Sequence, residues 1–411
     1  MRGEAGTVSL TRRVQFAAAH RYRRAEWDEE RNVAAFGKCA RLEYHGHTYT
    51  VDITVSGDVD SLTGMIVFNA YTNGRSNNGE QYPTIAGTGT TVENGGGTLS
   101  QSIVGLTYQG PQIFGGGKVN AFAHFDLWGG SPSNSLNHAV RLRVAEISLD
   151  WKNQSLMVGQ DKPIVSPRDP TSLAQVAFSP LTASGNPWFW QPQVRFEQRF
   201  HFGDTAGLKA RFGVYQTSEP VASAGDEYAP TLAVSRPAAQ GRFEFWKEFS
   251  NGARIEIAPG FHTSNTHVDG ISIPSRLFTI DWLVRPVRKL EVTGMFFKGK
   301  NAAGIGALRQ GFTILDDERF ASVRAAGGWT QISYQATSRL SFNAYSGQES
   351  NRAVDLLLGG ITRNFTYAGN VQYRIASNVV LGIEASQVRT KRVNAVERLN
   401  NHYDLAVAYL F

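Results

Sequence analysis

Hydrophobic and polar residues alternate along most of this chain, and the alternation is clearest at residues 401–411. On one face of an extended strand lie Tyr403, Leu405, Val407, Tyr409 and Phe411, and on the other lie His402, Asp404, Ala406 and Ala408. Successive side chains of a strand point to opposite faces. The pattern therefore predicts a β-strand with one apolar face and one polar face.

The same alternation recurs through most of the chain. In the stretch 194–202, for example, Val194 and Phe196 oppose Arg195 and Glu197. Many of these stretches are joined by short turns, of which Asn251-Gly252 is the strongest hairpin signal. We count about sixteen predicted strands of this kind.

Long polar segments separate the other pairs of strands. We expect them at residues 75–99, 129–137, 161–190, 217–240, 263–274, 300–320, 346–361 and 389–400. Short turns at one end and long loops at the other are typical of a transmembrane β-barrel. A soluble β-sandwich would have to bury the arginines and glutamates of the polar face, whereas a sixteen-stranded barrel encloses water. The sequence thus predicts an all-β fold, a large antiparallel barrel of the transmembrane type.

Residues 68–411 resemble the trimeric diffusion porins of bacterial outer membranes. The terminal Phe411, with an aromatic residue two positions before it, is similar to the C-terminal insertion signal of outer-membrane barrels. The resemblance implies a homotrimer surrounded by outer-membrane lipid, through which small solutes diffuse. No nucleic-acid partner is expected.

The polar face of the predicted barrel is rich in basic residues. The chain carries 41 Lys and Arg against 35 Asp and Glu, and residues 1–67 hold nine of each, so the net charge of +6 belongs to the barrel part. Positive side chains in a narrow aqueous pore concentrate anions, which predicts a modest preference for small anionic solutes such as carboxylates. Alternatively, these charges pair across neighbouring strands and leave the pore nearly unselective. The predicted pore-lining residues are Arg195, Arg199, Lys209, Arg211, Arg242, Arg254 and Arg374.

Residues 161–190 contain five prolines and cannot continue a strand ladder, because proline lacks the backbone N–H. A loop of this length in a compact domain calls for a role. It is either an ordinary surface loop or a segment folded into the barrel to narrow it. In the second case its candidate constriction residues are Asp161, Lys162, Arg168 and Asp169.

Residues 1–67 have a different character. A predicted strand at 8–19 ends at His20, and His45 and His47 lie two apart, so both would share one face of a strand. Three imidazoles with an open fourth position form a catalytic zinc arrangement. Cys39 lies six residues before His45, where a metal and its neighbours could lower the pKa of its thiol.

Four motifs in this stretch, FAAAH (16–20), FGKC (36–39), HGHTYTV (45–51) and GDVDSLTGMIV (57–67), resemble the 6-pyruvoyl- and 6-carboxy-tetrahydropterin synthase family. The resemblance implies a truncated α+β segment with Zn²⁺ on His20, His45 and His47, Cys39 as catalytic thiol, and a pterin precursor as ligand. It covers about the first sixth of the chain. The family's remaining acid–base groups and pterin anchor have no counterpart, so lyase activity is not expected. The alternative function is a zinc-dependent carbon–carbon lyase of queuosine biosynthesis, 6-carboxy-tetrahydropterin synthase.

We therefore predict a hybrid chain, with a synthase-like segment at 1–67 joined to a porin-like barrel at 68–411. The join is either a genuine gene fusion or an artefact of the gene model. Arginines such as Arg12, Arg13 and Arg21 interrupt any apolar segment that could act as a signal peptide. As written, the chain is expected to remain in the cytoplasm, although the barrel part belongs in an outer membrane.

Overall fold

The structure is a computed structural model that describes residues 7–20, 22–40, 45–58, 61–72, 95–129, 138–174, 179–217, 236–268, 271–308, 310–314 and 320–411. The chain forms two compact units, Met1–Asp60 and Ser61–Phe411. None of the helices in these ranges is long and apolar enough to cross a membrane.

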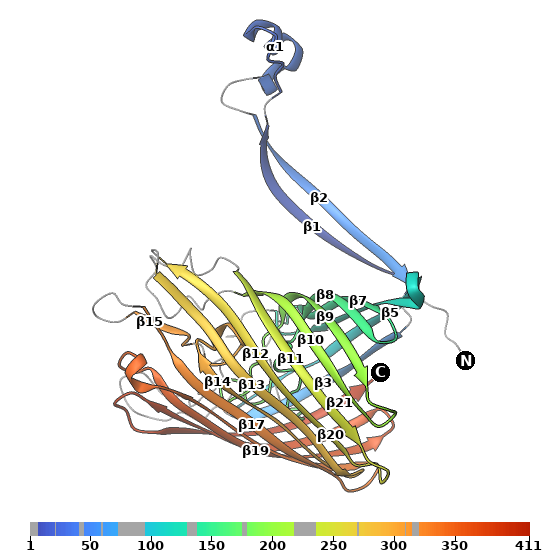
Figure 1. Ribbon diagram of the computed structural model, residues 1–411, viewed down its shortest axis with the longest axis vertical. Coiled ribbons are helices and arrows are strands. Elements are labelled where there is room, and N and C mark those ends of the chain that lie inside the picture. The colour runs from blue at the N-terminus through green and yellow to red at the C-terminus, as the bar shows by residue number, and fades with distance from the viewer. Residues whose placement is uncertain are drawn as a thin grey trace. The chain divides into compact units, whose positions relative to one another are not determined.

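The first unit consists of a two-stranded antiparallel ribbon and a short helical segment (Figure 1). Strand β1 (Thr7–His20) pairs with β2 (His45–Asp58) along its whole length. Between them lie α1 (Glu29–Phe36) and the 3₁₀ turn η1 (Gly37–Ala40). The Asp28 carboxylate caps α1 by accepting a hydrogen bond from the Arg31 N–H at 2.7 Å, which satisfies an otherwise unpaired donor.

The second unit is a closed antiparallel barrel, confirming the predicted fold class (Figure 1). Its strands are β3 (Ser61–Thr72), β4 (Gly95–Thr98), β5 (Ile103–Ile113), β6 (Gly117–Asp126), β7 (Arg141–Asp150), β8 (Gln154–Asp161), β9 (Gln191–His201), β10 (Ala206–Thr217), β11 (Arg236–Glu248), β12 (Arg254–Val268), β13 (Ile271–Val287), β14 (Leu290–Lys300), β17 (Arg324–Gln335), β18 (Leu340–Asn351), β19 (Ile361–Ala376), β20 (Val379–Arg392) and β21 (Arg398–Leu410). Shorter elements are η2 (Phe114–Gly116), η5 (Ala303–Ile305), η6 (Ala353–Asp355) and the small hairpin of β15 (Phe312–Ile314) with β16 (Phe320–Ser322).

The barrel closes where its first and last strands pair. β3 pairs with β21, and Gly64 and Phe411 exchange backbone hydrogen bonds of 2.9 and 3.1 Å. On its other side β3 pairs with β4 near its end and with β5 near its start, so these two strands share one of the sixteen strand positions. The backbones are close here: a Cβ on Gly64 would lie 2.3 Å from the Ile103 carbonyl oxygen.

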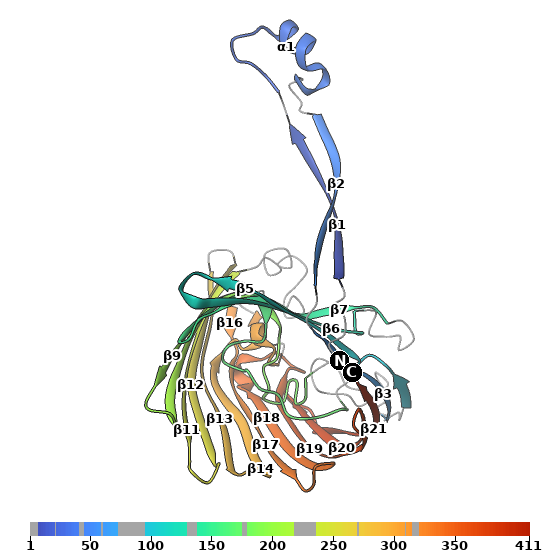
Figure 2. The ribbon, with the colours of Figure 1, turned by 90° about the vertical axis from the view of Figure 1, so that its right-hand side faces the viewer.

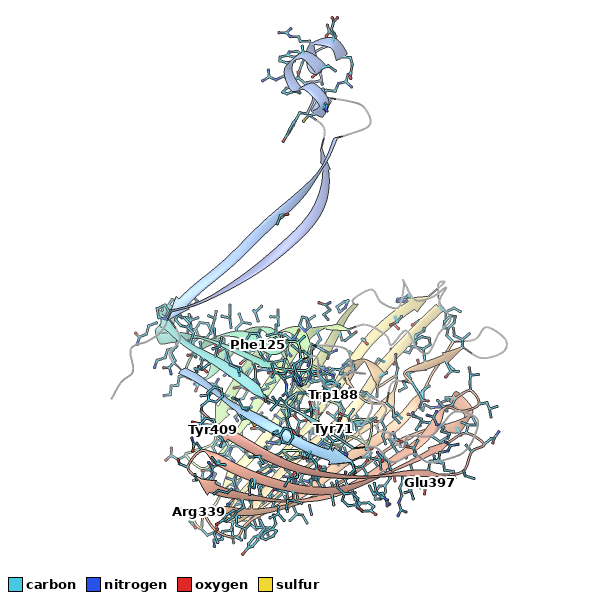
Figure 3. The ribbon with its side chains drawn as sticks, turned by 180° about the vertical axis from the view of Figure 1, so that it is seen from behind. Tyr71, Phe125, Trp188, Arg339, Glu397 and Tyr409 are labelled. Atoms are coloured by element: carbon cyan, nitrogen blue, oxygen red, sulfur yellow. The ribbon has the colours of Figure 1, made fainter. Side chains whose placement is uncertain are left out.

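Apolar side chains cover the outer face of the barrel and polar ones the inner face. In β21 the apolar residues Tyr403, Leu405 and Tyr409 are exposed, whereas His402 and Asp404 are buried inside. Figure 3 places Arg339, in the turn between β17 and β18, and Glu397, in the connection between β20 and β21, at opposite ends of the barrel. The alternation read from the sequence therefore identifies the inward face.

Two boundaries differ from those expected from the sequence. The first barrel strand begins at Ser61, earlier than the expected start at Phe68. The long loop expected at 263–274 is wrong, because β12 runs to Val268 and β13 begins at Ile271. The pairing of β6 with β7 contains a register shift, because His124 pairs with Val144 and Phe125 with Leu142.

Candidate functional site

The proline-rich segment between β8 and β9 lies inside the barrel (Figure 2, green trace within the ring of strands). Its backbone is hydrogen-bonded to distant parts of the wall. The Ile164 N–H donates to the Tyr215 hydroxyl on β10 at 2.7 Å, and the Thr171 N–H donates to the Gln331 side chain on β17 at 2.5 Å. Farther along, the Leu173 carbonyl accepts from Asn69 on β3 at 2.8 Å. Because these strands lie on different sides of the barrel, the segment crosses the lumen.

Arg168 fastens this segment to the wall. Its guanidinium forms ion pairs with the inward carboxylates of Glu256 on β12 and Asp281 on β13. At the start of the segment, Asp161 pairs with Arg195 on β9 at 2.6 Å, and Lys162 pairs with Asp169 at 2.6 Å. The four charged residues picked from the sequence thus lie in ion pairs inside the barrel.

A second segment, residues 301–308 and 310–313, also packs inward, which the sequence did not lead us to expect. The Gly304 carbonyl accepts from the Gln191 side chain at 2.8 Å, and the Leu308 N–H donates to the Glu349 carboxylate at 2.9 Å. Both segments contribute to one apolar cluster inside the wall of β13–β19: Val165, Leu181, Leu277, Met295, Phe297, Ala302, Ile305, Ala307, Ala325, Trp329, Tyr345 and Ala368. This side of the lumen is therefore filled by protein.

The basic residues on β7–β12, together with Arg168, share a smaller set of buried carboxylates. Each of five carboxylates forms ion pairs with two bases: Asp126 with Arg141 and Arg143, Glu197 with Arg199 and Arg211, Glu244 with Lys209 and Arg242, Glu256 with Arg168 and Arg254, and Asp281 with Arg168 and Arg242. We call Asp126, Glu197, Glu244, Glu256 and Asp281 the shared carboxylates. Eight bases pair with these five acids, and two of the bases have a further partner, Asp150 for Arg199 and Glu248 for Arg254. Eight bases thus face seven acids, which leaves a small excess of positive charge.

The two kinds of charge differ in their access to water. In one cluster, Lys209 is 29% exposed whereas its partner Glu244 is 5% exposed. In another, Arg141 is 24% exposed and Asp126 only 3%. Among the bases of the shared carboxylates Arg242 is the exception, since its side chain is 1% exposed. In these clusters, the groups that reach the lumen water are mainly guanidinium and ammonium groups.

Some exposed acids oppose this excess. Arg195 lies between two carboxylates, Asp161 at 2.6 Å and Glu146 at 3.5 Å, and both acids keep about as much exposure as the arginine. Asp169 is 28% exposed beside Lys162. The local excess of positive charge is therefore partly offset near the start of the inward segment.

Arg141 and Arg143 on β7 are charged lumen residues that the sequence interpretation missed. Both guanidinium groups lie over the Trp190 ring, with Cζ 5.2 and 4.5 Å from its centroid, and both pair with Asp126. The register shift in β7 hid them, because it breaks the simple alternation that identified the other basic residues. Their spacing of two residues was the available signal.

The predicted pore-lining residues all lie on inward positions of their strands, but not in equivalent surroundings. Arg195, Arg199, Lys209, Arg211 and Arg254 are partly exposed in ion pairs. Arg242 is closed off from solvent between Glu244 and Asp281. Arg374 lies near a short turn and donates to the Ser377 carbonyl at 2.6 Å.

The candidate metal ligands of the first unit lie in the ribbon. His20 pairs with His45 in the β1–β2 register, and His47 follows two residues later, so the three residues share one face of the ribbon. Their side chains lie outside the described residues. Cys39 is half-buried in η1, where its carbonyl accepts from the Tyr22 N–H at 2.9 Å. Where side chains are described, no group of three His, Cys, Asp or Glu residues could hold a metal ion.

Comparisons with known proteins divide the chain in the same way. Residues 9–72 match the family of 6-pyruvoyl tetrahydropterin synthase. The chain is 47% identical to the 6-pyruvoyl tetrahydrobiopterin synthase of Drosophila melanogaster over 58 residues, which are 14% of this chain and 34% of that protein. It is 40% identical to the human enzyme over 60 residues, or 15% of this chain and 41% of that protein. The chain thus spans well under half the length of these relatives.

The barrel resembles outer-membrane channels of known structure. The outer membrane channel DcaP of Acinetobacter baumannii superposes with a TM-score of 0.68 at 15% identity, covering 86% of this chain and 97% of that one. The anion-selective porin from Comamonas acidovorans gives a TM-score of 0.56 at 12% identity, covering 85% and 99%. The trimer form of OmpT from Vibrio cholerae gives 0.51 at 9%, covering 85% and 98%. At these identities the likeness establishes the fold, a porin-like barrel.

Proposed function

We propose that the barrel is a diffusion channel in an outer membrane, with a modest preference for small anions such as carboxylates. Its polar inner face suits a water-filled passage, and its apolar outer face suits lipid. The two inward segments would narrow the passage and displace it toward the wall of β5–β12. The likeness to porins, including one described as trimeric, supports a homotrimeric assembly.

The observation that carries the anion preference is the unequal exposure of paired charges. If acids and bases paired symmetrically, their fields at the lumen would cancel and the channel would be nearly unselective. Here most bases of the shared carboxylates are 21–29% exposed, whereas the carboxylates themselves are 3–10% exposed. At the shared carboxylates, a permeating anion therefore meets positive groups, whereas the acids are less accessible to a cation. Partly exposed acids keep the expected preference modest: Glu146, Asp150, Asp161, Asp169 and Glu248.

The reversal potential of the refolded full-length chain in a planar bilayer with a KCl gradient tests this proposal. We expect the sign that corresponds to chloride permeating faster than potassium. The double variant Lys209→Gln, Arg211→Gln should move the potential toward zero. It should also fold, because Glu244 keeps Arg242 and Glu197 keeps Arg199 as partners.

A matched control removes two basic residues from the outer face, Lys298→Gln and Lys300→Gln, and should leave the reversal potential unchanged. A cation-selective potential in the unaltered chain would contradict the anion preference. Failure of the well-folded chain to conduct at all would contradict the channel itself.

A second candidate function rests on the family match at residues 9–72. A bound Zn²⁺ would supply Lewis-acid polarisation of a substrate oxygen. The register of His20, His45 and His47 on one ribbon face fits a three-imidazole site, and Cys39 would act as the proton-transferring thiol. The chain spans only 34–41% of the relatives' length, so we expect zinc binding without turnover.

Assay of the purified chain with zinc and dihydroneopterin triphosphate checks this expectation. We predict no product, and equilibrium zinc binding that falls at least tenfold in His45→Ala. Turnover that disappears in Cys39→Ala would show that the segment alone is a working lyase.

A further inference from the structure

We infer that the lumen holds a binding site for aromatic carboxylates, formed by Arg143, Trp190 and Phe122. This inference rests on the proposed function, because it names one class among the anions that the channel would take. It combines two features of neighbouring strands, a guanidinium group that no carboxylate of the wall binds by a hydrogen bond and an aromatic side chain on the polar inner face.

Arg141 and Arg143 share Asp126, but only Arg141 is hydrogen-bonded to it. The Arg141 Nε and Nη2 atoms donate to the two carboxylate oxygens of Asp126 at 3.0 and 2.5 Å. Arg143 approaches Asp126 only to 3.7 Å, which is too long for a hydrogen bond. In the part of the chain that the structure describes, its Nε atom has no hydrogen-bond partner. The Arg143 side chain is 21% exposed, so the outer part of the guanidinium reaches the lumen.

Trp190 holds the Arg143 guanidinium in place. The Arg143 Cζ atom lies 4.5 Å from the centroid of the Trp190 ring, and Trp188 packs edge-on against that ring at 5.1 Å. A guanidinium held on an aromatic ring loses little freedom when it binds a ligand. Its fork of N–H groups matches the two oxygens of a carboxylate. The geometry therefore favours a planar carboxylate over a spherical ion such as chloride.

Phe122 breaks the polar pattern of the inner face. It pairs with Glu146 on β7, whose carboxylate lies 3.5 Å from Arg195 inside the barrel, so Phe122 points inward as well. Its ring is half-buried and lies 5.5 Å from the ring of His124. The other inward positions of β6 are polar: Lys118, Asn120, His124 and Asp126. An apolar ring beside lumen water suits contact with an apolar part of a solute.

The two features lie next to each other. Arg143 precedes Val144, which pairs with His124, and Phe122 is the next inward residue along β6. On the other side of β6, Gly105 of β5 has no side chain, and a Cβ there would lie 3.5 Å from the Phe122 ring. Residues two apart on a strand are separated by about 7 Å, a distance that a benzoate-sized molecule spans. Such an anion places its carboxylate on Arg143 and its ring along His124 and Phe122.

Nearby acids keep this site weak. Asp169 interacts electrostatically with Arg143 but is bound to Lys162 at 2.6 Å, and Glu146 lies beside Arg195. Within the described ranges, neither acid forms an ion pair with Arg143. Their negative charges favour release of a bound anion, which a channel requires.

A saturation-transfer NMR titration of the refolded full-length chain with benzoate and with acetate measures binding whether or not the chain conducts. We expect benzoate to bind at least fivefold more tightly, because only benzoate carries a ring that contacts Phe122. Arg143→Gln should weaken benzoate binding about tenfold, since it removes a charge-assisted pair. This variant should fold, because Asp126 keeps Arg141 as a partner. Equal affinities for the two anions, or an unchanged benzoate affinity in Arg143→Gln, would overturn the inference.

Two further variants separate the ring contact and the planar fork from charge alone. Phe122→Leu should weaken benzoate binding about threefold and leave acetate binding unchanged. The matched control Phe125→Leu, on the outer face of the same strand, should change neither. Arg143→Lys keeps the charge, so the reversal potential in KCl should stay, but benzoate binding should weaken severalfold. Equal effects of Phe122→Leu and Phe125→Leu, or full benzoate affinity in Arg143→Lys, would contradict the site.

Benzyl alcohol, which has the ring without the charge, serves as the ligand control. If it binds as tightly as benzoate, the site is apolar and the assignment to a carboxylate is wrong. Channel recordings on the same preparation separate the two proposals. Anion-selective conduction without benzoate binding contradicts only this inference, whereas benzoate binding that depends on Arg143 in a chain that does not conduct contradicts only the proposed function.

Discussion

At the scale of single residues, the inner wall is organised by carboxylates that each hold two bases. A buried carboxylate with two partners keeps one ion pair when either base is removed, so exposed bases can be replaced without leaving a buried charge alone. Lys209 and Arg211 are examples, because Arg242 and Arg199 remain beside the same acids. Selectivity can therefore be tuned at these positions at little cost to the fold.

Arg168 differs from the other bases because it belongs to the inward segment rather than to a strand. We predict that Arg168→Gln loosens this segment by about 3 kcal/mol, since it removes the pairs that join the segment to two buried carboxylates. Single-channel records should show larger conductance and more frequent current fluctuations. Arg254→Gln is the matched control: it also removes a partner of Glu256 but leaves Arg168 in place, and should cost less than about 1 kcal/mol. Equal channel noise in the two variants would contradict a fastening role for Arg168.

At the scale of elements, the sequence predicted strands where one face meets lipid. It failed near the long-loop ends, as at 263–274, where the outward face of the sheet is polar. Asn265 and Ser272 there are exposed and hydrogen-bonded to each other at 2.7 Å. A strand that continues beyond the hydrocarbon into water loses its apolar face and with it the alternating pattern. Such stretches look like loops in a sequence.

The sequence predicted which residues face inward, but not which of them form ion pairs with one another. Alternation placed Arg195 and Arg211 on the inward face, because that assignment depends only on position within a strand. Their ion-pair partners were not predictable from alternation alone, since Arg211 pairs with Glu197 on the neighbouring strand β9. The second inward segment left a signal that was overlooked, the apolar residues Ala302, Ile305 and Leu308, which are buried in the structure.

At the scale of the whole molecule, the two resemblances overlap in one strand. The synthase family match extends to residue 72, whereas β3 (Ser61–Thr72) lies between β21 and β5 in the barrel. The same residues therefore carry a family's sequence pattern and complete a porin-like wall. Val67 illustrates this double role. It lies within the family match, and its side chain is fully buried on the inner face of the barrel, whereas its neighbours Ile66 and Phe68 are exposed on the outer face.

We predict that the barrel needs β3 but not the residues before it. A chain that starts at Ser61 should refold into a compact species that migrates faster on SDS gels before heating, and it should conduct in bilayers. A chain that starts at residue 73 should do neither, because β21 and β5 would each lose a partner and leave unpaired backbone groups in lipid, at a cost of several kcal/mol for each group. The two variants differ by one strand, which makes each the control for the other. Equal folding of both would mean that β3 is dispensable for closure and that the barrel part begins later than Ser61.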